Sequence, residues 1–336
     1  MEKKKIRKEY IFLAVIIIVL SLILILRNPN KIQYELPELK PIDQADISKI
    51  EIIKPSETLT LQQKNGVWTL GPEEYPADEY RSNAIIDAVK DLTLTALISE
   101  TENYSLYGLD KDNRISVRVY SENELIREFE MGKDASTYRH TYVKIKDDKR
   151  VYHARNSFKN DFDQELNDLR DKSVLSFDKS EITAVELLWK DNSIKFKKEI
   201  RPVEKEDKSE EEETPNEPQE KEPEKPETEE FWVTEDGKEA IKTELENIID
   251  QCSDLKCQEF IYGKTKDDFK DPILTITFTG AAKDYILTVF ENSEEHNDHH
   301  PAISSENKYL FLLTKNKIDN LNQKPEKLLG QEEKKD

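Results

Sequence analysis

The densest group of side chains with metal-binding chemistry is the stretch 294–300, EEHNDHH, which holds three of the five histidines. His296 and His300 are four residues apart and would share a metal ion if the stretch were helical. The stretch precedes Pro301, however, and falls between two predicted strands. In an internal repeat described below, His140 occupies the equivalent loop without the carboxylates. We therefore interpret the stretch as a polar loop and predict no metal-binding residues.

The two cysteines, Cys252 and Cys257, are five positions apart, which is too far for a CxxC redox site. Two interpretations stay open. Both thiols can be small core residues, because the repeat aligns them with Val89 and Leu94. A disulfide at the end of a helix is the other interpretation, if the compartment is oxidising.

The sequence contains no recognisable catalytic signature. Each of the eight glycines is isolated, so no phosphate-binding loop or nucleophile elbow is present in the sequence. Carboxylates are too numerous for one pair to stand out as an acid–base couple. Some aromatic side chains could line a sugar-binding surface, although packing within a sheet is the preferred interpretation: Tyr104, Tyr107, Tyr138 and Trp68. We predict a protein that is not an enzyme, with no catalytic residues, no cofactor-binding residues and no cofactor.

The formal net charge is -20, and the stretch 203–230, with 14 acidic and 4 basic residues, supplies half of it. The only basic cluster lies within residues 3–8 at the N-terminus. Phosphate backbones are bound by clustered basic surfaces, so nucleic acid is excluded as a partner. The sequence does not identify a small-molecule ligand.

An uncharged apolar run occupies residues 11–26, and five lysines and arginines precede it. This pattern predicts a transmembrane anchor at 10–27. The positive-inside rule puts a basic tail, 1–9, in the cytoplasm and the bulk of the chain outside, in a single-pass protein of a bacterial inner membrane. A cleaved signal peptide is disfavoured because the run ends in bulky leucine and isoleucine. A proline-containing spacer, 28–43, follows.

An internal repeat is the strongest signal beyond this segment. Residues 46–52 (DISKIEI) align with 181–187 (EITAVEL), and the helical pattern at 83–92 (NAIIDAVKDL) aligns with 246–255 (ENIIDQCSDL). Alternating apolar and polar residues on either side predict strands, including one with Trp68 in the first copy and Trp232 in the second.

The predicted fold class is therefore α+β: an N-terminal transmembrane helix and two tandem copies of a strand-rich, mostly antiparallel module. The copies run over 44–175 and 176–326, and a charged tail, 327–336, follows. The stretch 203–230 has a disordered composition. It aligns with a short turn near Gly66, so it is predicted to be an insertion in a hairpin loop rather than a linker.

Three segments of the first copy, DISKIEIIKPSETLTLQQKNGVWTL, YPADEYRSNAIIDAVKDL and YGLDKDNRISVRVY, resemble the bacterial DUF4340 family. The family's function is unknown, so the resemblance implies no catalytic residues. The resemblance implies that the gene lies beside genes for gliding-type ABC export components. Protein partners such as an ABC permease or auxiliary subunit are therefore expected. We expect a non-enzymatic, membrane-anchored extracytoplasmic accessory or scaffold. The alternatives are a module binding cell-envelope polymers (peptidoglycan or polysaccharide) and an unrecognised hydrolase.

Overall fold

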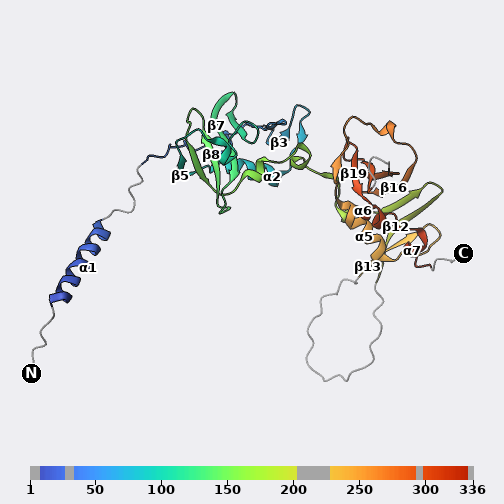
Figure 1. Cartoon of the computed structure of the whole chain (residues 1–336). Helices are drawn as coiled ribbons and strands as arrows, with labels where there is room; N and C mark the ends of the chain where they lie inside the picture. Colours follow the sequence, from blue (N-terminus) through green and yellow to red (C-terminus); the bar gives the residue numbers. More distant parts are fainter. Residues whose placement is uncertain (1–7, 27–33, 203–227, 293–297, 332–336) are drawn as a thin grey trace, which may run out of the picture. The chain divides into compact units, whose positions relative to one another are not determined.

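The structure, a computed structural model, describes residues 8–26, 34–202, 228–292 and 298–331 (Figure 1). The chain divides into two compact units, Met1–Leu169 and Arg170–Asp336. The sequence placed the boundary a few residues later, between 175 and 176.

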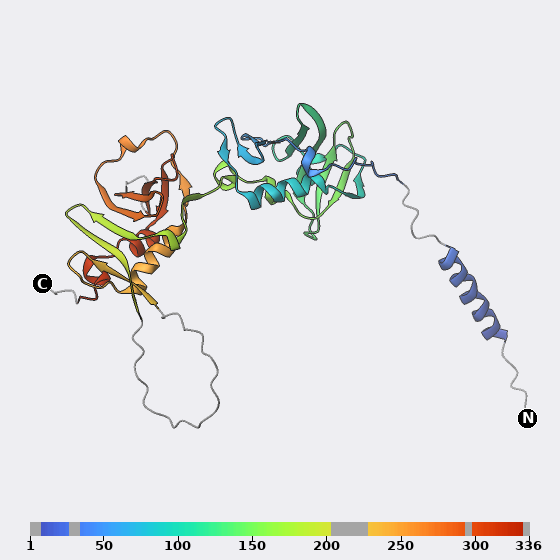
Figure 2. The ribbon, with the colours of Figure 1, turned by 180° about the vertical axis from the view of Figure 1, so that it is seen from behind.

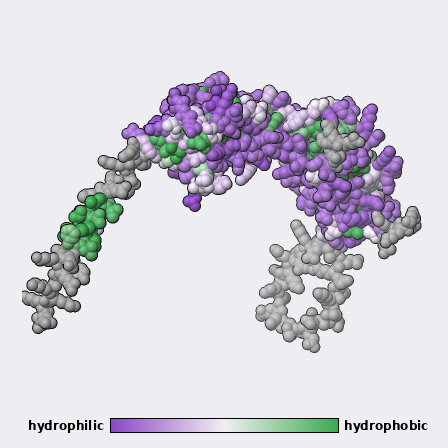
Figure 3. Space-filling view, viewed as in Figure 1, coloured by the Kyte–Doolittle hydropathy of each residue, from purple (hydrophilic) through white to green (hydrophobic). Residues whose placement is uncertain are grey.

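The N-terminal helix α1 comprises Lys8–Leu26 and is 19 residues long. The side chains of residues 12–25 are exposed and apolar apart from one serine (Figure 3). Lys8 and Glu9 open the helix, so its uncharged part falls short of the roughly 20 apolar residues that typically cross a bilayer. No helix among the described residues is long and apolar enough to span a membrane. The prediction of an anchor at 10–27, and with it the single-pass inner-membrane localisation, is therefore wrong.

The first unit is built on one antiparallel sheet with the order β4-β3-β2-β1-β6-β7-β8-β9-β5. Alternating side chains of these strands are buried, as in Ile50 and Ile52, because one face of the sheet forms the core. The strands are β1 (Lys49–Ile53), β2 (Thr58–Lys64), β3 (Val67–Leu70), β4 (Tyr75–Pro76), β5 (Leu94–Ser99), β6 (Ile115–Ser121), β7 (Glu124–Asp134), β8 (His140–Ile145) and β9 (Val151–Arg155).

Helix α2 (Glu79–Lys90) supplies the second layer of this unit, along one face of the sheet (Figure 2). The Asp78 side chain caps it by accepting a hydrogen bond from the backbone N–H of Arg81. Its buried side chains include Ile85 and Val89, two members of the predicted stripe. Two short helical turns end the unit, α3 (Lys159–Phe162) and α4 (Leu166–Leu169). Short 3-10 turns, η1 (Gln44–Asp46) and η2 (Tyr104–Tyr107), complete the unit.

The second unit has a sheet with the order β13-β12-β11-β16-β17-β18-β19-β15. The eight strands of this sheet have the same order as the eight strands from β3 to β5 in the first sheet, with β13 in the place of β3 and β15 in the place of β5. The strands are β11 (Ala184–Trp189), β12 (Asn192–Pro202), β13 (Thr228–Thr234), β15 (Glu259–Phe260), β16 (Pro272–Thr279), β17 (Asp284–Phe290), β18 (His299–Ser304) and β19 (Phe311–Thr314); β10 (Ser173–Ser176) and β14 (Asp254–Lys256) form a separate pair.

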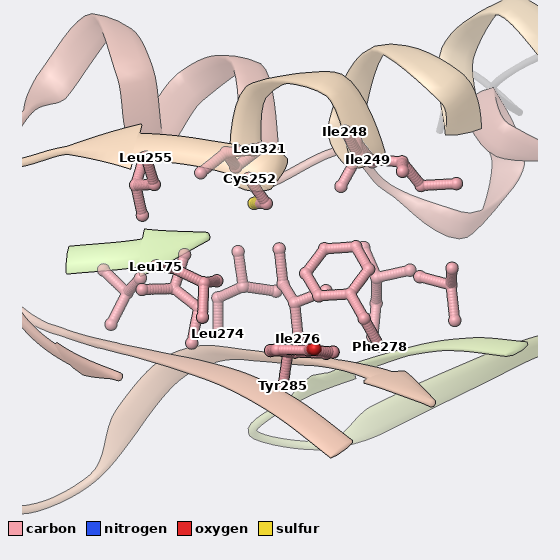
Figure 4. Packing of buried hydrophobic residues seen from close by; sticks show 14 of the residues in the cluster. Leu175, Ile248, Ile249, Cys252, Leu255, Leu274, Ile276, Phe278, Tyr285 and Leu321 are labelled. Atoms are coloured by element: carbon pink, nitrogen blue, oxygen red, sulfur yellow. The ribbon is translucent and has the colours of Figure 1, made fainter. Parts of the chain in front are cut away.

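Helix α5 (Lys242–Ser253) covers this second sheet as α2 covers the first (Figure 4). Cys252 and Ile248 point from α5 toward Ile276 and Phe278 of the sheet. The remaining helices are η3 (Lys179–Glu181), η4 (Lys266–Asp268), α6 (Lys315–Leu321) and α7 (Pro325–Leu328). The predicted tail at 327–336 begins too early, because Leu328 is fully buried in the core of this unit.

The two units differ at one hairpin. In the first, β2 and β3 are joined by Asn65 and Gly66, both with positive φ, as a tight two-residue turn requires. In the second, the ladder continues for three more pairs, the last being Pro202 with Thr228. The acidic stretch thus follows a hairpin arm. Its predicted end at 230 is wrong, because 228–230 belong to β13, and 203–227 lie outside the described residues.

Candidate binding site

Two histidines of the histidine-rich stretch lie in a strand rather than in the predicted loop. Residues 293–297, and His296 with them, lie outside the described residues, whereas His299 and His300 begin strand β18. His300 is buried, and its Nδ1 donates a hydrogen bond to the carbonyl oxygen of Phe290 at 3.1 Å. His140 lies in β8, and its ring stacks on that of His153 with the centroids 4.9 Å apart. Across the described ranges, no three metal-ligating side chains come together.

Both cysteines are free thiols with buried side chains. Burial raises the pKa of Cys252 to about 12 and that of Cys257 to about 11. A thiol is nucleophilic as its thiolate, so neither group is activated. The open question from the sequence is thus answered in favour of two small core residues.

The four aromatic residues considered as a sugar-binding surface are not brought together. Tyr107 packs against Tyr142, with ring centroids 5.0 Å apart, and Tyr104 donates a hydrogen bond to the Lys149 carbonyl oxygen. Trp68 lies in β3, which four strands separate from β8. Tyr138 is exposed in the loop before β8.

A different place in the fold has the geometry of a binding site. A pocket of about 330 Å³ lies in the second unit where α5 and η3 meet the hairpin of β12 and β13. The indole of Trp232 is 3% exposed and contributes an apolar wall, together with Ile249 of α5. The other lining residues are Lys179, Ser180, Lys198, Glu230, Glu246 and Asp250. We call this the Trp232 pocket.

Ion pairs compensate most of the charge in the Trp232 pocket. The Lys198 Nζ lies 3.3 Å from the carboxylate of Glu230. The Lys179 Nζ lies 2.7 Å from Asp250, and this hydrogen bond raises the pKa of Lys179. Glu246 makes no ion pair or hydrogen bond within the described residues, although the Lys179 cation also attracts it at longer range. The pocket is thus lined by three carboxylates and two lysines, and this excess of negative charge suits a ligand with a cationic group.

The first unit has the same framework with different charges. Its Gln63–Trp68 pair occupies the register of Lys198–Trp232, and the repeat aligns Asp87 with Asp250. At three of the four other charged positions, however, the first unit has neutral amides: the residues Gln44, Gln63 and Asn83 stand where the second unit has Lys179, Lys198 and Glu246. The fourth, Glu230, belongs to the part of the hairpin arm that the first unit lacks. Sequence reasoning missed this site, although these differences between aligned copies were a visible signal.

The same hairpin also provides a sheet edge that is covered only in part. Proteins commonly blunt their edges with short strands, proline or bulges. Strand β4 has two residues including Pro76, β5 carries two register shifts, and β15 has two residues. Strand β13 has seven residues in regular register with β12.

Part of β13 is covered on its outer side. The backbone N–H of Ala240 donates to the Trp232 carbonyl oxygen, and that of Thr234 donates to the Lys238 carbonyl oxygen. Among the described residues, no segment pairs with the outer side of 228–231. This open edge adjoins the Trp232 pocket, because Glu230 belongs to both.

The architecture defines a duplicated antiparallel α+β protein whose second copy carries a charge-lined surface pocket. The model of a family described as a domain of unknown function, DUF4340, matches residues 68–274, and the chain belongs to that family. The matched region includes every residue that lines the Trp232 pocket. No curated protein and no solved structure matches the chain.

Proposed function

We propose that this chain is a non-enzymatic accessory protein that binds a protein partner through the Trp232 pocket of its second unit. The observation that carries the proposal is the contrast between the copies. The framework around Trp68 and Trp232 is the same, but the second copy alone has charged residues at three positions around it. A charge-lined surface is typical of protein recognition.

The finer form of the proposal names the partner class. The resemblance of the sequence to its family implies association with gliding-type ABC export components, so we propose a permease, an ATPase or an auxiliary subunit of such a system as the partner. The accessory role requires no chemistry from this chain, only a specific contact.

The test is co-purification with the full chain as bait, followed by identification of the captured proteins. We expect an ABC export component to be recovered. The variant Glu246→Lys reverses the charge of one pocket carboxylate and should lower the recovery at least about tenfold. Asn247→Lys adds a positive charge at the next residue, which is exposed and does not line the pocket, and should leave the recovery unchanged.

Recovery of no export component from the wild-type bait would reject the finer form. Equal recovery with Glu246→Lys would reject the pocket as the contact. Retention of the chain on polysaccharide, with no protein captured, would favour the alternative of a polymer-binding module.

A further inference from the structure

We propose that the open edge of β13 binds an extended, lysine- or arginine-bearing segment of the partner as an additional antiparallel strand. This inference rests on the proposed function and specifies how the partner is held. Strand addition to an exposed edge obtains affinity from backbone hydrogen bonds and selectivity from pockets that take alternate side chains.

The backbone geometry identifies the groups available for pairing. The Thr234 N–H and the Trp232 carbonyl oxygen both point away from β12, since they bond to Lys238 and Ala240. Backbone direction alternates along a strand, so the N–H and carbonyl of Glu230 point to the same outer side. Residues 238–240 bond to the outer side of β13 at Thr234 and Trp232. The outward N–H and carbonyl of Glu230 lie next along the same edge and are available to an added strand.

The side chains indicate what the added strand carries. Glu230 and Trp232 share a face of β13, the face on which the Trp232 pocket opens. Ile200 lies opposite Glu230 on the inner strand β12 and is 64% exposed, but β13 separates it from a strand added at the edge. Glu246 adds a second carboxylate on the pocket face. An incoming strand with alternating basic and apolar residues would set a cation beside Glu230 on the pocket face, where Glu230 and Glu246 both attract it.

The experiment measures binding of a short, capped peptide of alternating lysine and valine to the full chain by calorimetry. We expect binding that a glutamate–valine peptide does not show. The decisive variant is Glu230→Pro, which removes the outward N–H but leaves the pairing with β12, because proline is tolerated at such edge positions. Glu230→Gln is the matched control, since it loses the same carboxylate and keeps the N–H.

If a strand is added, Glu230→Pro weakens peptide binding about tenfold and Glu230→Gln about threefold or less. Amide hydrogen exchange at Glu230 also slows in the wild-type complex. Equal weakening by both variants would mean attraction by charge alone and would overturn the proposal, as would absence of binding. A chain that pairs through β13 with a second copy of itself, seen as a dimer by mass, would overturn it too.

Failure here is distinguishable from failure of the proposed function. If Glu246→Lys abolishes capture of the protein partner while both Glu230 variants retain it, the pocket is the contact and strand addition is rejected. If the wild-type bait captures no protein, the proposed function is itself rejected.

Discussion

Lys198 and Trp232 face each other across β12 and β13, with the Lys198 Nζ 5.3 Å from the centroid of the indole ring. The corresponding pair in the first unit is Gln63 and Trp68. The same aromatic position therefore has a neutral neighbour in one copy and a cation in the other.

The Lys198 contact gives the first prediction. Replacing Lys198 with glutamine, as in the first unit, should lower the free energy of unfolding by about 1 kcal/mol, because a cation–π contact and a partly buried ion pair are lost. The control is Lys195→Gln on the other face of β12, whose side chain is 41% exposed and 4.0 Å from Glu186. It should change stability by less than about 0.5 kcal/mol. Urea unfolding measures both, and equal effects would contradict the assignment.

A second prediction concerns Arg127, whose buried side chain forms no ion pair with the residues that the structure describes. Its guanidinium donates to the carbonyl oxygens of Val89 and Lys90 at the C-terminal end of α2, and to that of Lys40. Burial lowers the pKa of Arg127, but the carbonyl oxygens and the negative end of the helix dipole favour the cation. Arg127→Met should therefore lower the free energy of unfolding by about 3 kcal/mol, as measured by urea unfolding.

The matched control for Arg127 is Arg118 in the neighbouring strand. Its side chain is 43% exposed and paired with Glu128. Arg118→Met should cost less than about 1 kcal/mol in the same unfolding experiment. If the two substitutions proved equally mild, the hydrogen bonds of Arg127 to the backbone would not stabilise the fold in the way that we predict.

A third prediction rests on Gly132, where the turn η2 approaches β7. A Cβ at this position would overlap the Tyr107 carbonyl oxygen and lie 2.9 Å from the carbonyl carbon of Gly108, both of them backbone atoms. Gly132→Ala should destabilise the protein by about 3 kcal/mol, because backbone cannot move aside as a side chain can. A Cβ at Gly66 would have no atom within 4 Å. Gly66→Ala should therefore destabilise the protein by only about 1 kcal/mol, because alanine is strained at the positive φ of this residue. Thermal unfolding would test the order of the two.

The carboxyl of Asp148 gives a pH-dependent prediction. Hydrogen bonds from the Arg150 side chain, together with those from its backbone N–H and the Tyr152 hydroxyl, lower the pKa of Asp148 to about 2. Because the pKa is lowered on folding, this carboxylate stabilises the fold fully above about pH 4, and the contribution is lost as the pH falls toward 2. Asp148→Asn should therefore be less stable than wild type at pH 7, with a difference that shrinks below pH 4.

The neighbouring Asp147 serves as the control for the pH series. It is exposed and has a φ of 60°, a conformation that asparagine tolerates. Asp147→Asn should leave the urea midpoint almost unchanged at every pH. An Asp148 carboxyl that titrates near pH 4 by NMR would refute the prediction.

The last prediction uses the alignment of Cys252 with Val89. Both side chains are fully buried on equivalent helices, so Cys252→Val should cost less than about 1 kcal/mol. Cys252→Ser places an unpaired hydroxyl in the same core and should cost about 2 kcal/mol. In the folded wild type neither thiol should react with a maleimide at pH 7, and both should react in urea. Rapid labelling of the folded protein would contradict the burial of the thiols.

Much of the sheet could be read from the residues. Alternation in DISKIEI and EITAVEL comes from strands with one buried face, and the aligned helical stripes of Val89 and Cys252 come from helices packed on those faces. The Asn65–Gly66 turn was also visible, because those residues adopt positive φ most readily.

Long-range placement could not be predicted. Strand β5 pairs with β9 across many intervening residues, and no local pattern specifies that partner. His300 was assigned to a loop because of Pro301, but β17 pairs with β18 only from Ala302 onward, so the proline needs no donor on that side. The Trp232 pocket was missed because its charged residues form no recognisable motif, and only a comparison of the two copies makes them stand out.

The hairpin arm of the second unit also has a consequence for the order of folding. In the first unit, β2 and β3 can pair from their two-residue turn outward, and the formation of such a local hairpin takes microseconds. In the second, β12 and β13 are the same pair of strands, but the whole stretch 203–227 separates them. Closing that longer loop costs more entropy before the first contact forms. We therefore expect β12 to pair first with β11, across its short turn, and β13 to pair with β12 later. In a refolding experiment, the strand that carries Trp232 would be the last strand of this sheet to form.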